Sequence, residues 1–180
     1  MTSSKSTLFG NFVASAALAT LMVSCWPQPV AHQDHVLAPL VHPTTVILLS
    51  PEEKCEMSKQ CAKLAEVGYF EARSESDEGV LATMFTVLNR VDHPQYPYTI
   101  HDVVHQPKQF SYVHDGSLER GITEPEQFRR TLSLAYSLLT EGIESPIGDS
   151  THYHTTSVNP YWASSLTHVT TIGSHKFYSY

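Results

Sequence analysis

Three stretches of the sequence carry apolar residues at the three- and four-residue spacing of an amphipathic helix, and no other feature constrains the fold as strongly. They cover approximately residues 56–73, 78–91 and 123–142. The last stretch has the clearest limits, because Thr123-Glu124-Pro125-Glu126 has the form of a capping box and Gly142 is a typical stop signal. In the second stretch, Asp77 is the expected N-cap. The sequence therefore predicts three packed helices.

The chain after Gly148 has an extended character instead. Residues 151–155 show the alternation of a strand, and residues 165–172 are rich in Thr and Val, which favour strands. Together with the helical stretches, these segments predict an α+β fold that is mainly helical and has a small C-terminal antiparallel sheet.

Composition limits the kinds of partner that the protein can have. The 180 residues include 18 acidic and 11 basic ones, which gives a formal net charge of −7. Binding to a polyanion needs the opposite balance, so nucleic acid is not an expected partner. An apolar content of 41% is enough for a packed core, and the length suits one domain with short appendages.

The first 25 residues have the features of an export signal. Lys5 precedes a mostly apolar stretch, residues 8–23, that is too short and too interrupted for a membrane-spanning helix. This stretch ends in Leu21-Met22-Val23-Ser24-Cys25, which resembles the lipobox of bacterial lipoproteins and makes Cys25 a candidate for lipidation and membrane tethering. Ordinary secretion and a retained N-terminal anchor are the alternatives. We expect an exported protein, either periplasmic, at the outer membrane or cell surface, or secreted.

A linker separates this signal from the folded part of the chain. Residues 26–52 contain five prolines and little periodicity, which is typical of an extended tether. Within it, Val46-Ile47-Leu48-Leu49 is a candidate for one strand. The expected domain covers residues 53–180.

Two cysteines lie at the start of this domain. Cys55 and Cys61 are close enough in sequence for a small disulfide loop at the head of the first helix, as an oxidising compartment would allow. A zinc site is the weaker interpretation, because it would need further ligands and tighter spacing. Two free, buried thiols are the remaining alternative.

Glu71 is the candidate that carries the chemistry. It continues the apolar stripe of the first predicted helix, so its carboxyl group should be poorly solvated and its pKa raised. Glu75 would add like-charge repulsion if the helix continues that far. A carboxylic acid that stays protonated near neutral pH is suited to protonating a glycosidic oxygen. From spacing alone, a buried ion pair of Glu71 with Arg73 or Arg90 is the simpler interpretation.

A long connection, residues 92–122, joins the second and third predicted helices and is rich in Pro, His, Tyr and Gly. A connection of this length in a small domain is usually functional. Short blocks within it and on both sides of it follow one another in a fixed order over about residues 61–178. The blocks are Phe70-Glu71-Ala72-Arg73-Ser74-Glu75, Glu78-Gly79, Val87-Leu88-Asn89-Arg90-Val91, Tyr96-Pro97, Val103-Val104, Gln109-Phe110-Ser111, Gly148-Asp149-Ser150-Thr151-His152-Tyr153-His154, Pro160-Tyr161-Trp162-Ala163 and Ile172-Gly173-Ser174-His175-Lys176-Phe177-Tyr178. Together they resemble the SleB-type cell wall hydrolase family, and several ordered blocks are far more specific than a lone motif.

The resemblance implies a lysozyme-like catalytic domain over residues 53–180 that acts on peptidoglycan glycan strands and needs no cofactor. The family's glutamate corresponds to Glu71. It would act as general acid and then as general base, as in a lytic transglycosylase, which cuts the bond between N-acetylmuramic acid (MurNAc) and N-acetylglucosamine (GlcNAc) and leaves 1,6-anhydro ends. If water competes, the same site gives muramidase products.

Further residues of the matching blocks are candidates for binding the substrate. Amide, hydroxyl and aromatic side chains suit an amidosugar, although packing in a small core is an equally good explanation for each aromatic residue. Bracing a loop is the competing role of Asn89, and bracing the sheet is that of His175. The candidates are Glu75, Asn89, Gln109, Phe110, Ser111, Tyr153, His154, Trp162 and His175.

Two other functions remain open. His152 and His154 would share one face of a strand, and His175 or Asp149 would complete a zinc site with Glu71 as the base, as in a peptidoglycan amidase or peptidase. The sequence lacks the H-E-x-x-H motif of many zinc peptidases. The third interpretation is a wall protein that binds glycan strands without cutting them.

Overall fold

The computed structural model describes residues 48–180. The predicted export signal, Cys25 and most of the predicted linker lie outside the described residues. Of the strand expected at residues 46–49, only Leu48 and Leu49 are described, and they are not in a strand. The chain instead enters a helix directly, because the Ser50 hydroxyl accepts a hydrogen bond from the Glu53 amide and the Glu53 carboxylate accepts one from the Ser50 amide.

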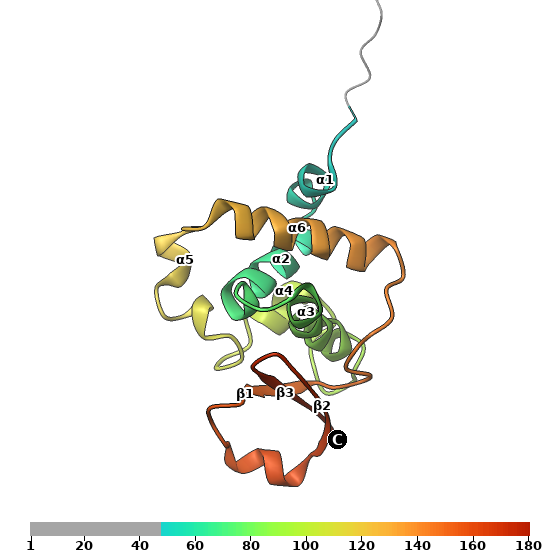
Figure 1. The fold of residues 1–180 in the computed structure, drawn as a ribbon, viewed down its shortest axis with the longest axis vertical. Coiled ribbons are helices and arrows are strands. Elements are labelled where there is room, and N and C mark those ends of the chain that lie inside the picture. Colours follow the sequence, from blue (N-terminus) through green and yellow to red (C-terminus); the bar gives the residue numbers. More distant parts are fainter. Residues whose placement is uncertain (1–47) are drawn as a thin grey trace, which may run out of the picture. The chain divides into compact units, whose positions relative to one another are not determined.

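Four helices form the larger part of the domain (Figure 1). The first predicted helix is divided in two at Ser58, whose extended backbone ends one helix and begins the next. The Cys55–Cys61 disulfide, with the two Cα atoms 5.0 Å apart, joins the two helices across this break. The helices are α1 (Pro51–Met57), α2 (Lys59–Ala72), α3 (Asp77–Val91) and α6 (Pro125–Thr140).

Two predicted helix starts are corrected by the structure. The N-cap of α3 is Ser76, whose hydroxyl accepts from the Gly79 amide, so Asp77 is the first helical residue. The start of α6 has no side-chain cap. The amides of Thr123 and Glu124 donate instead to the hydroxyl of Tyr69 on α2, 3.1 Å away in both cases. A tertiary contact therefore replaces the capping box that the local sequence suggests.

Helix α2 lies between α3 and α6 and forms the centre of the core. The three helices approach closely at Gly68, where an added Cβ would collide with the side chains of Met84 and Val80 on α3 and touch Thr131 on α6. The apolar stripe of α2 is fully buried, as its spacing predicts. The largest fully buried side chains are Tyr69, Phe110, Phe177, Leu64, Met84, Leu132, Ile147, Val67, Val80, Val87, Val103 and Val104.

The long connection between α3 and α6 is less irregular than its composition suggests. It contains α4 (Ile100–Val104), a 3-10 turn η1 (Ser111–Val113) and the short α5 (Ser117–Arg120). Val103 and Val104 are completely buried, which fixes this connection to the helical core.

The C-terminal part forms a three-stranded antiparallel sheet with the order β1-β3-β2. The strands are β1 (His152–Thr155), β2 (Thr167–Ile172) and β3 (His175–Ser179), and a 3-10 turn η2 (Tyr161–Ser165) lies between the first two. Figure 1 shows the sheet at one end of the helical layer. The predicted α+β fold is confirmed, while β3 was not singled out as a separate strand.

Side chains from the C-terminal end of α3 and from the turn before α3 attach the sheet to the helices. At the end of α3, Asn89 donates to the carbonyls of Gly148 (2.9 Å) and Ser150 (2.8 Å), and Arg90 Nε donates to that of Thr151 (2.8 Å). Before α3, the Glu75 carboxylate accepts hydrogen bonds from both the amide and the hydroxyl of residue 174 in the β2–β3 turn. The adjacent Gly173 has a positive φ of 55° and has no room for a side chain, because a Cβ would collide with this carboxylate.

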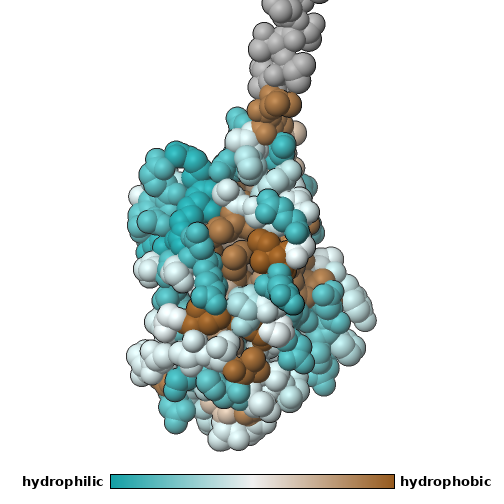
Figure 2. All heavy atoms as spheres, turned by 45° about the vertical axis from the view of Figure 1, so that its right-hand side comes forward, coloured by the Kyte–Doolittle hydropathy of each residue, from teal (hydrophilic) through white to brown (hydrophobic). Residues whose placement is uncertain are grey.

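On the face drawn in Figure 2, apolar residues appear as separate patches among hydrophilic ones. None of the helices in the described part of the chain has the length and the apolar character needed to cross a membrane.

The disulfide gives a first prediction. It closes a short loop, so replacing both cysteines by Ala should lower the free energy of unfolding by about 2 kcal/mol, which urea unfolding would measure. The matched control is the wild-type protein under reducing conditions, which should lose a similar amount. Equal stability of oxidised wild type and double variant would show that the bridge does not stabilise the fold.

Candidate active site

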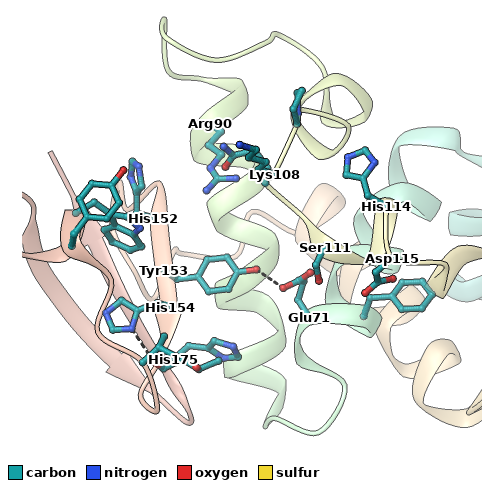
Figure 3. Close-up of a pocket in the computed structure, with 17 residues that line it drawn as sticks. Glu71, Arg90, Lys108, Ser111, His114, Asp115, His152, Tyr153, His154 and His175 are labelled. Atoms are coloured by element: carbon teal, nitrogen blue, oxygen red, sulfur yellow. Dashed lines mark hydrogen bonds between the residues drawn. The ribbon is translucent and has the colours of Figure 1, made fainter.

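A groove of about 1180 Å³ lies between the end of α2, the long connection and the sheet (Figure 3). Its walls carry several carboxylate, imidazole and aromatic side chains that come from distant parts of the sequence. The lining residues are Phe70, Glu71, Arg90, Pro107, Lys108, Gln109, Ser111, His114, Asp115, His152, Tyr153, His154, Thr155, Val158, Tyr161, Trp162 and His175.

Glu71 lies in the last turn of α2 and faces this groove. The turn after it is held in place by Arg130 of α6, which donates to the carbonyls of Arg73 (3.3 Å) and Glu75 (2.9 Å) and pairs with Asp77. Helix α2 ends at Ala72, and these contacts hold the turn that follows the Glu71 carboxyl group.

Burial raises the pKa of Glu71 above its ordinary value, as its place on the apolar stripe predicts. The hydrogen bond from Tyr153 and the charge of Arg90 act in the opposite direction, and the charge of Asp115 adds to the rise. The predicted ion pairs of Glu71 are not formed. Arg73 pairs with Glu124 at 2.7 Å, and Arg90 uses its Nε to bind a backbone carbonyl.

Tyr153 provides the direct polar contact to Glu71. Its hydroxyl donates to Glu71 Oε2 over 2.9 Å, and Figure 3 shows the ring extending from the sheet toward α2. Burial, followed by the charge of Glu71, holds the pKa of Tyr153 well above its ordinary value, so the phenol remains a donor. When Glu71 is neutral, the carbonyl oxygen is the better acceptor, so its own proton is on Oε1. The proton is then available to a molecule in the groove.

The Tyr153 ring is itself held by its neighbours on β3. His175 contacts it edge-on, with the ring centroids 5.3 Å apart, and Phe177 packs against it at 5.8 Å. Burial lowers the pKa of His175, which favours the neutral ring. His175 therefore lines the groove and also supports Tyr153.

Six of the predicted binding residues line the groove together with Glu71. They come from the long connection, from β1 and η2, and from β3, which explains why their proximity is not visible in the sequence. These residues are Gln109, Ser111, Tyr153, His154, Trp162 and His175.

The other three predicted binding residues do not line the groove. The Glu75 carboxylate is used by the β2–β3 turn, and Asn89 braces the chain before β1. Phe110 is only 1% exposed and belongs to the core. These three side chains therefore have structural contacts in the fold and no contact with the groove.

Several charged or polar residues of the groove were not predicted from the sequence. Asp115 is a second carboxylate, and hydrogen bonds from Ser117 lower its pKa, so the two carboxyl groups of the groove are shifted in opposite directions. Lys108 and His114 also come from the long connection, whose length was the available signal. Arg90 was considered as an ion-pair partner of Glu71 and not as a lining residue.

The arrangement of the strand histidines does not favour a zinc site. His154 Nδ1 lies 2.8 Å from the Thr155 carbonyl and donates to it, and Nε2 shares a hydrogen bond with the Tyr178 hydroxyl at 2.9 Å. Both nitrogens are thus engaged. Within residues 48–180, no three His, Cys, Asp or Glu side chains come together as a ligand set.

The contact between Tyr153 and Glu71 gives a second prediction. Tyr153→Phe removes a hydrogen bond that stabilises the carboxylate, so the pKa of Glu71 should rise further and its neutral form should persist to higher pH than in the wild type. Titration of the Glu71 carboxyl carbon by NMR measures this. Tyr161→Phe is the matched control, because the side chain of Tyr161 is 91% exposed and should leave the titration unchanged. An unchanged or lower pKa in Tyr153→Phe would contradict the assigned contact.

Comparisons with known proteins agree with this architecture. The spore cortex-lytic enzyme of Halalkalibacterium halodurans is 30% identical over 115 residues, which cover 63% of this chain and 33% of that enzyme. The spore cortex-lytic enzyme of Bacillus subtilis is 38% identical over 55 residues, which cover 31% of this chain and 18% of that enzyme. The chain thus spans a third or less of the length of these relatives.

Two solved structures share the fold. The catalytic domain of the Bacillus cereus SleB protein aligns with a TM-score of 0.55 and 26% identity, covering 68% of this chain and 91% of that domain. The catalytic domain of the germination-specific lytic transglycosylase SleB from Bacillus anthracis aligns with a TM-score of 0.55 and 25% identity, covering 68% and 96%. The profile of the cell wall hydrolase family matches residues 74–178, and Glu71 lies just before this range. Since that match covers more than half of the 180 residues, the chain belongs to the cell wall hydrolase family of enzymes.

Proposed function

We propose that the protein cleaves the MurNAc–GlcNAc bond of peptidoglycan as a lytic transglycosylase, with Glu71 as its general acid and base. The observation that carries this proposal is the half-buried Glu71 on the groove wall, with a raised pKa and one oxygen bound by Tyr153. The likeness to the catalytic domain from Bacillus anthracis, a lytic transglycosylase, supports the same reaction type.

In the first step, Glu71 donates the proton on Oε1 to the oxygen that bridges the two sugars. The bond from this oxygen to C1 of MurNAc breaks, and GlcNAc leaves as the free 4-hydroxyl. The MurNAc ring then has an oxocarbenium-like character, which the acetamido carbonyl of the same sugar can stabilise. The Tyr153 hydrogen bond stabilises the carboxylate that this step leaves on Glu71.

In the second step, the 6-hydroxyl of MurNAc attacks C1 of the same ring. Glu71, now a carboxylate, accepts the hydroxyl proton and returns to its neutral form. No water is consumed, and the product carries a 1,6-anhydro bridge. A single carboxyl group is therefore sufficient, in contrast to inverting and ordinary retaining hydrolases, which need two.

The groove offers suitable contacts for an amidosugar chain. Ser111 presents a hydroxyl group beside Glu71 (Figure 3), and the same groove is lined by the amide of Gln109 and by the aromatic side chains of Trp162 and the highly exposed Tyr161. Pyranose rings commonly pack on such faces while their hydroxyl groups bind polar side chains. We assign peptidoglycan glycan strands as the substrate on this basis.

Export fits this substrate, because peptidoglycan lies outside the cytoplasm. The Cys55–Cys61 disulfide supports it, since disulfides persist in oxidising compartments. We therefore propose an exported protein in which residues 53–180 are the catalytic domain and Cys25 is the candidate for lipid attachment.

The central test is removal of the acid. Glu71→Gln should reduce cleavage of purified peptidoglycan at least about 100-fold, because Gln cannot donate the required proton. Zymography measures the clearing, and Glu66→Gln, on the same helix, is the matched control that should keep it. Equal clearing by Glu71→Gln and wild type would refute the assignment of the acid. No clearing by wild type, with binding to glycan strands retained, would indicate a binding module.

The dependence of the cleavage rate on pH gives a further prediction. The acid must be protonated at the start of each cycle, so activity should fall as the pH rises through the raised pKa of Glu71.

Asp115 makes hydrolysis a second candidate reaction, because it is an ionised carboxylate beside the same groove. Under the transglycosylase proposal, Asp115→Asn should leave the anhydro products dominant, and mass spectrometry should find them about 18 Da lighter than hydrolytic ones. Asp102→Asn, on the exposed side of α4, is the matched control. Loss of cleavage in Asp115→Asn to the level of Glu71→Gln, with hydrolytic products from wild type, would favour the muramidase reaction.

A further inference from the structure

Arg90 is a buried cation that the proposed chemistry does not use. It lies in the last turn of α3, its side chain is 5% exposed, and the exposed part contributes to the wall of the groove. Its Nε is bound to the Thr151 carbonyl, and its guanidinium lies 5.5 Å from the ring centroids of Tyr96 and Phe110. Nη1 is itself buried and has no hydrogen-bond acceptor among residues 48–180.

Arg90 has no ion-pair partner in the described part of the chain, since none of the carboxylates there lies within ion-pair distance of it. The charges of Arg90 and Glu71 act on each other, but no hydrogen bond joins the two side chains. A buried charge without a partner is costly, and arginine remains protonated under almost all conditions. The site would gain from an anion supplied by a ligand.

A second cation borders the same groove. Lys108 is exposed and adopts a positive φ of 67°, a backbone conformation that non-glycine residues rarely take. In the view of Figure 3, Arg90 and Lys108 lie on one side of Tyr153 and His175 lies on the other. This part of the groove is thus cationic although the whole chain carries a net charge of −7.

We propose that Arg90, assisted by Lys108, binds a carboxylate attached to the lactyl ether of muramic acid. The inference rests on the proposed function and names the part of the substrate that the site distinguishes. MurNAc differs from GlcNAc only by this ether, so an anion-binding group in the groove sets which sugar occupies the position next to Glu71. The carboxylate is either the lactyl group itself, on strands without peptide, or a carboxylate of the attached peptide stem.

Arginine is well suited to this role. A guanidinium donates charge-assisted hydrogen bonds to a carboxylate, and its fixed plane sets the direction from which the bound group approaches. The Thr151 carbonyl and the two aromatic rings hold the guanidinium in one place before binding, so little side-chain freedom is lost.

Calorimetric titration of the full chain carrying Glu71→Gln tests the inference without turnover. The first pair of probes is a GlcNAc–MurNAc tetrasaccharide with free lactyl carboxylates and its methyl ester. The second pair is the same tetrasaccharide with peptide stems and its stem-esterified form. We expect the acid to bind about tenfold more tightly than the ester in at least one pair. The first pair identifies the lactyl carboxylate as the ligand, and the second identifies the stem.

Variants of Arg90 test the residue itself. Arg90→Met should abolish the preference for the acid and leave the affinity for the ester unchanged, whereas Arg90→Lys should retain part of the preference. Arg129→Met, which removes an exposed guanidinium on α6, is the matched control and should keep the full preference. If circular dichroism shows that Arg90→Met does not fold, the difference in affinity between acid and ester for the Glu71→Gln chain tests whether a carboxylate is bound. Arg90→Lys then tests the assignment to Arg90.

The outcomes separate this inference from the proposed function. Equal affinities of acid and ester in both pairs would overturn the inference while glycan binding stands. An unaltered preference in folded Arg90→Met would overturn the assignment to Arg90. Failure of every probe to bind would remove the inference together with the proposed substrate.

Discussion

The hydrogen bond between Tyr153 and Glu71 is the interaction on which the site depends. It joins residues that are 82 positions apart in the sequence, one from the sheet and one from the central helix. Without the sheet, Glu71 would lie at the end of a helix with less protection from solvent, and its pKa would approach the ordinary value. The sheet therefore acts as one wall of the groove and also sets the chemical state of the acid.

The scaffold around this contact is built to keep the end of α2 fixed. Arg130 binds the backbone of the α2–α3 turn from the α6 side, and Glu75 binds the β2–β3 turn from the same segment. The two contacts together connect α6, the α2–α3 turn and the sheet. Fixing the acid in this way matches the requirement of proton transfer, in which the donor must be held at a defined distance from the reacting oxygen.

The sequence predicted the helices and the buried position of Glu71 because both depend on local pattern, whereas the proposal that Glu71 is the acid came from the family resemblance. The stripe of α2 placed Glu71 on the buried side, and burial is the main cause of its raised pKa. The break at Ser58 was missed, although the Cys55–Cys61 disulfide that spans it was predicted from the spacing of the cysteines. The uncapped start of α6 was missed because the Tyr69 hydroxyl, a tertiary contact with no local signal, takes the place of the capping box.

The residues of the groove were harder to identify for a related reason. Glu75 and Asn89 belong to the same sequence blocks as Glu71 and Arg90, yet they bind the backbone of other segments. A block of matching sequence shows that a residue is constrained, and it does not show whether a substrate or the fold imposes the constraint. Asp115 and Lys108 were not singled out, because their meaning comes from where the long connection is folded.

The neighbouring side chains Asn89 and Arg90 have one consequence for how the chain can vary. They bind three carbonyls immediately before β1, those of residues 148, 150 and 151. These contacts fix the position of β1 along its own axis relative to α3. Successive side chains of a strand point to opposite faces, so a shift of one residue would turn Tyr153 away and present a histidine to Glu71. An inserted or deleted residue at this point would therefore remove the hydrogen bond between Tyr153 and Glu71 in a protein that still folds. The exposed loops, in contrast, should tolerate changes in length.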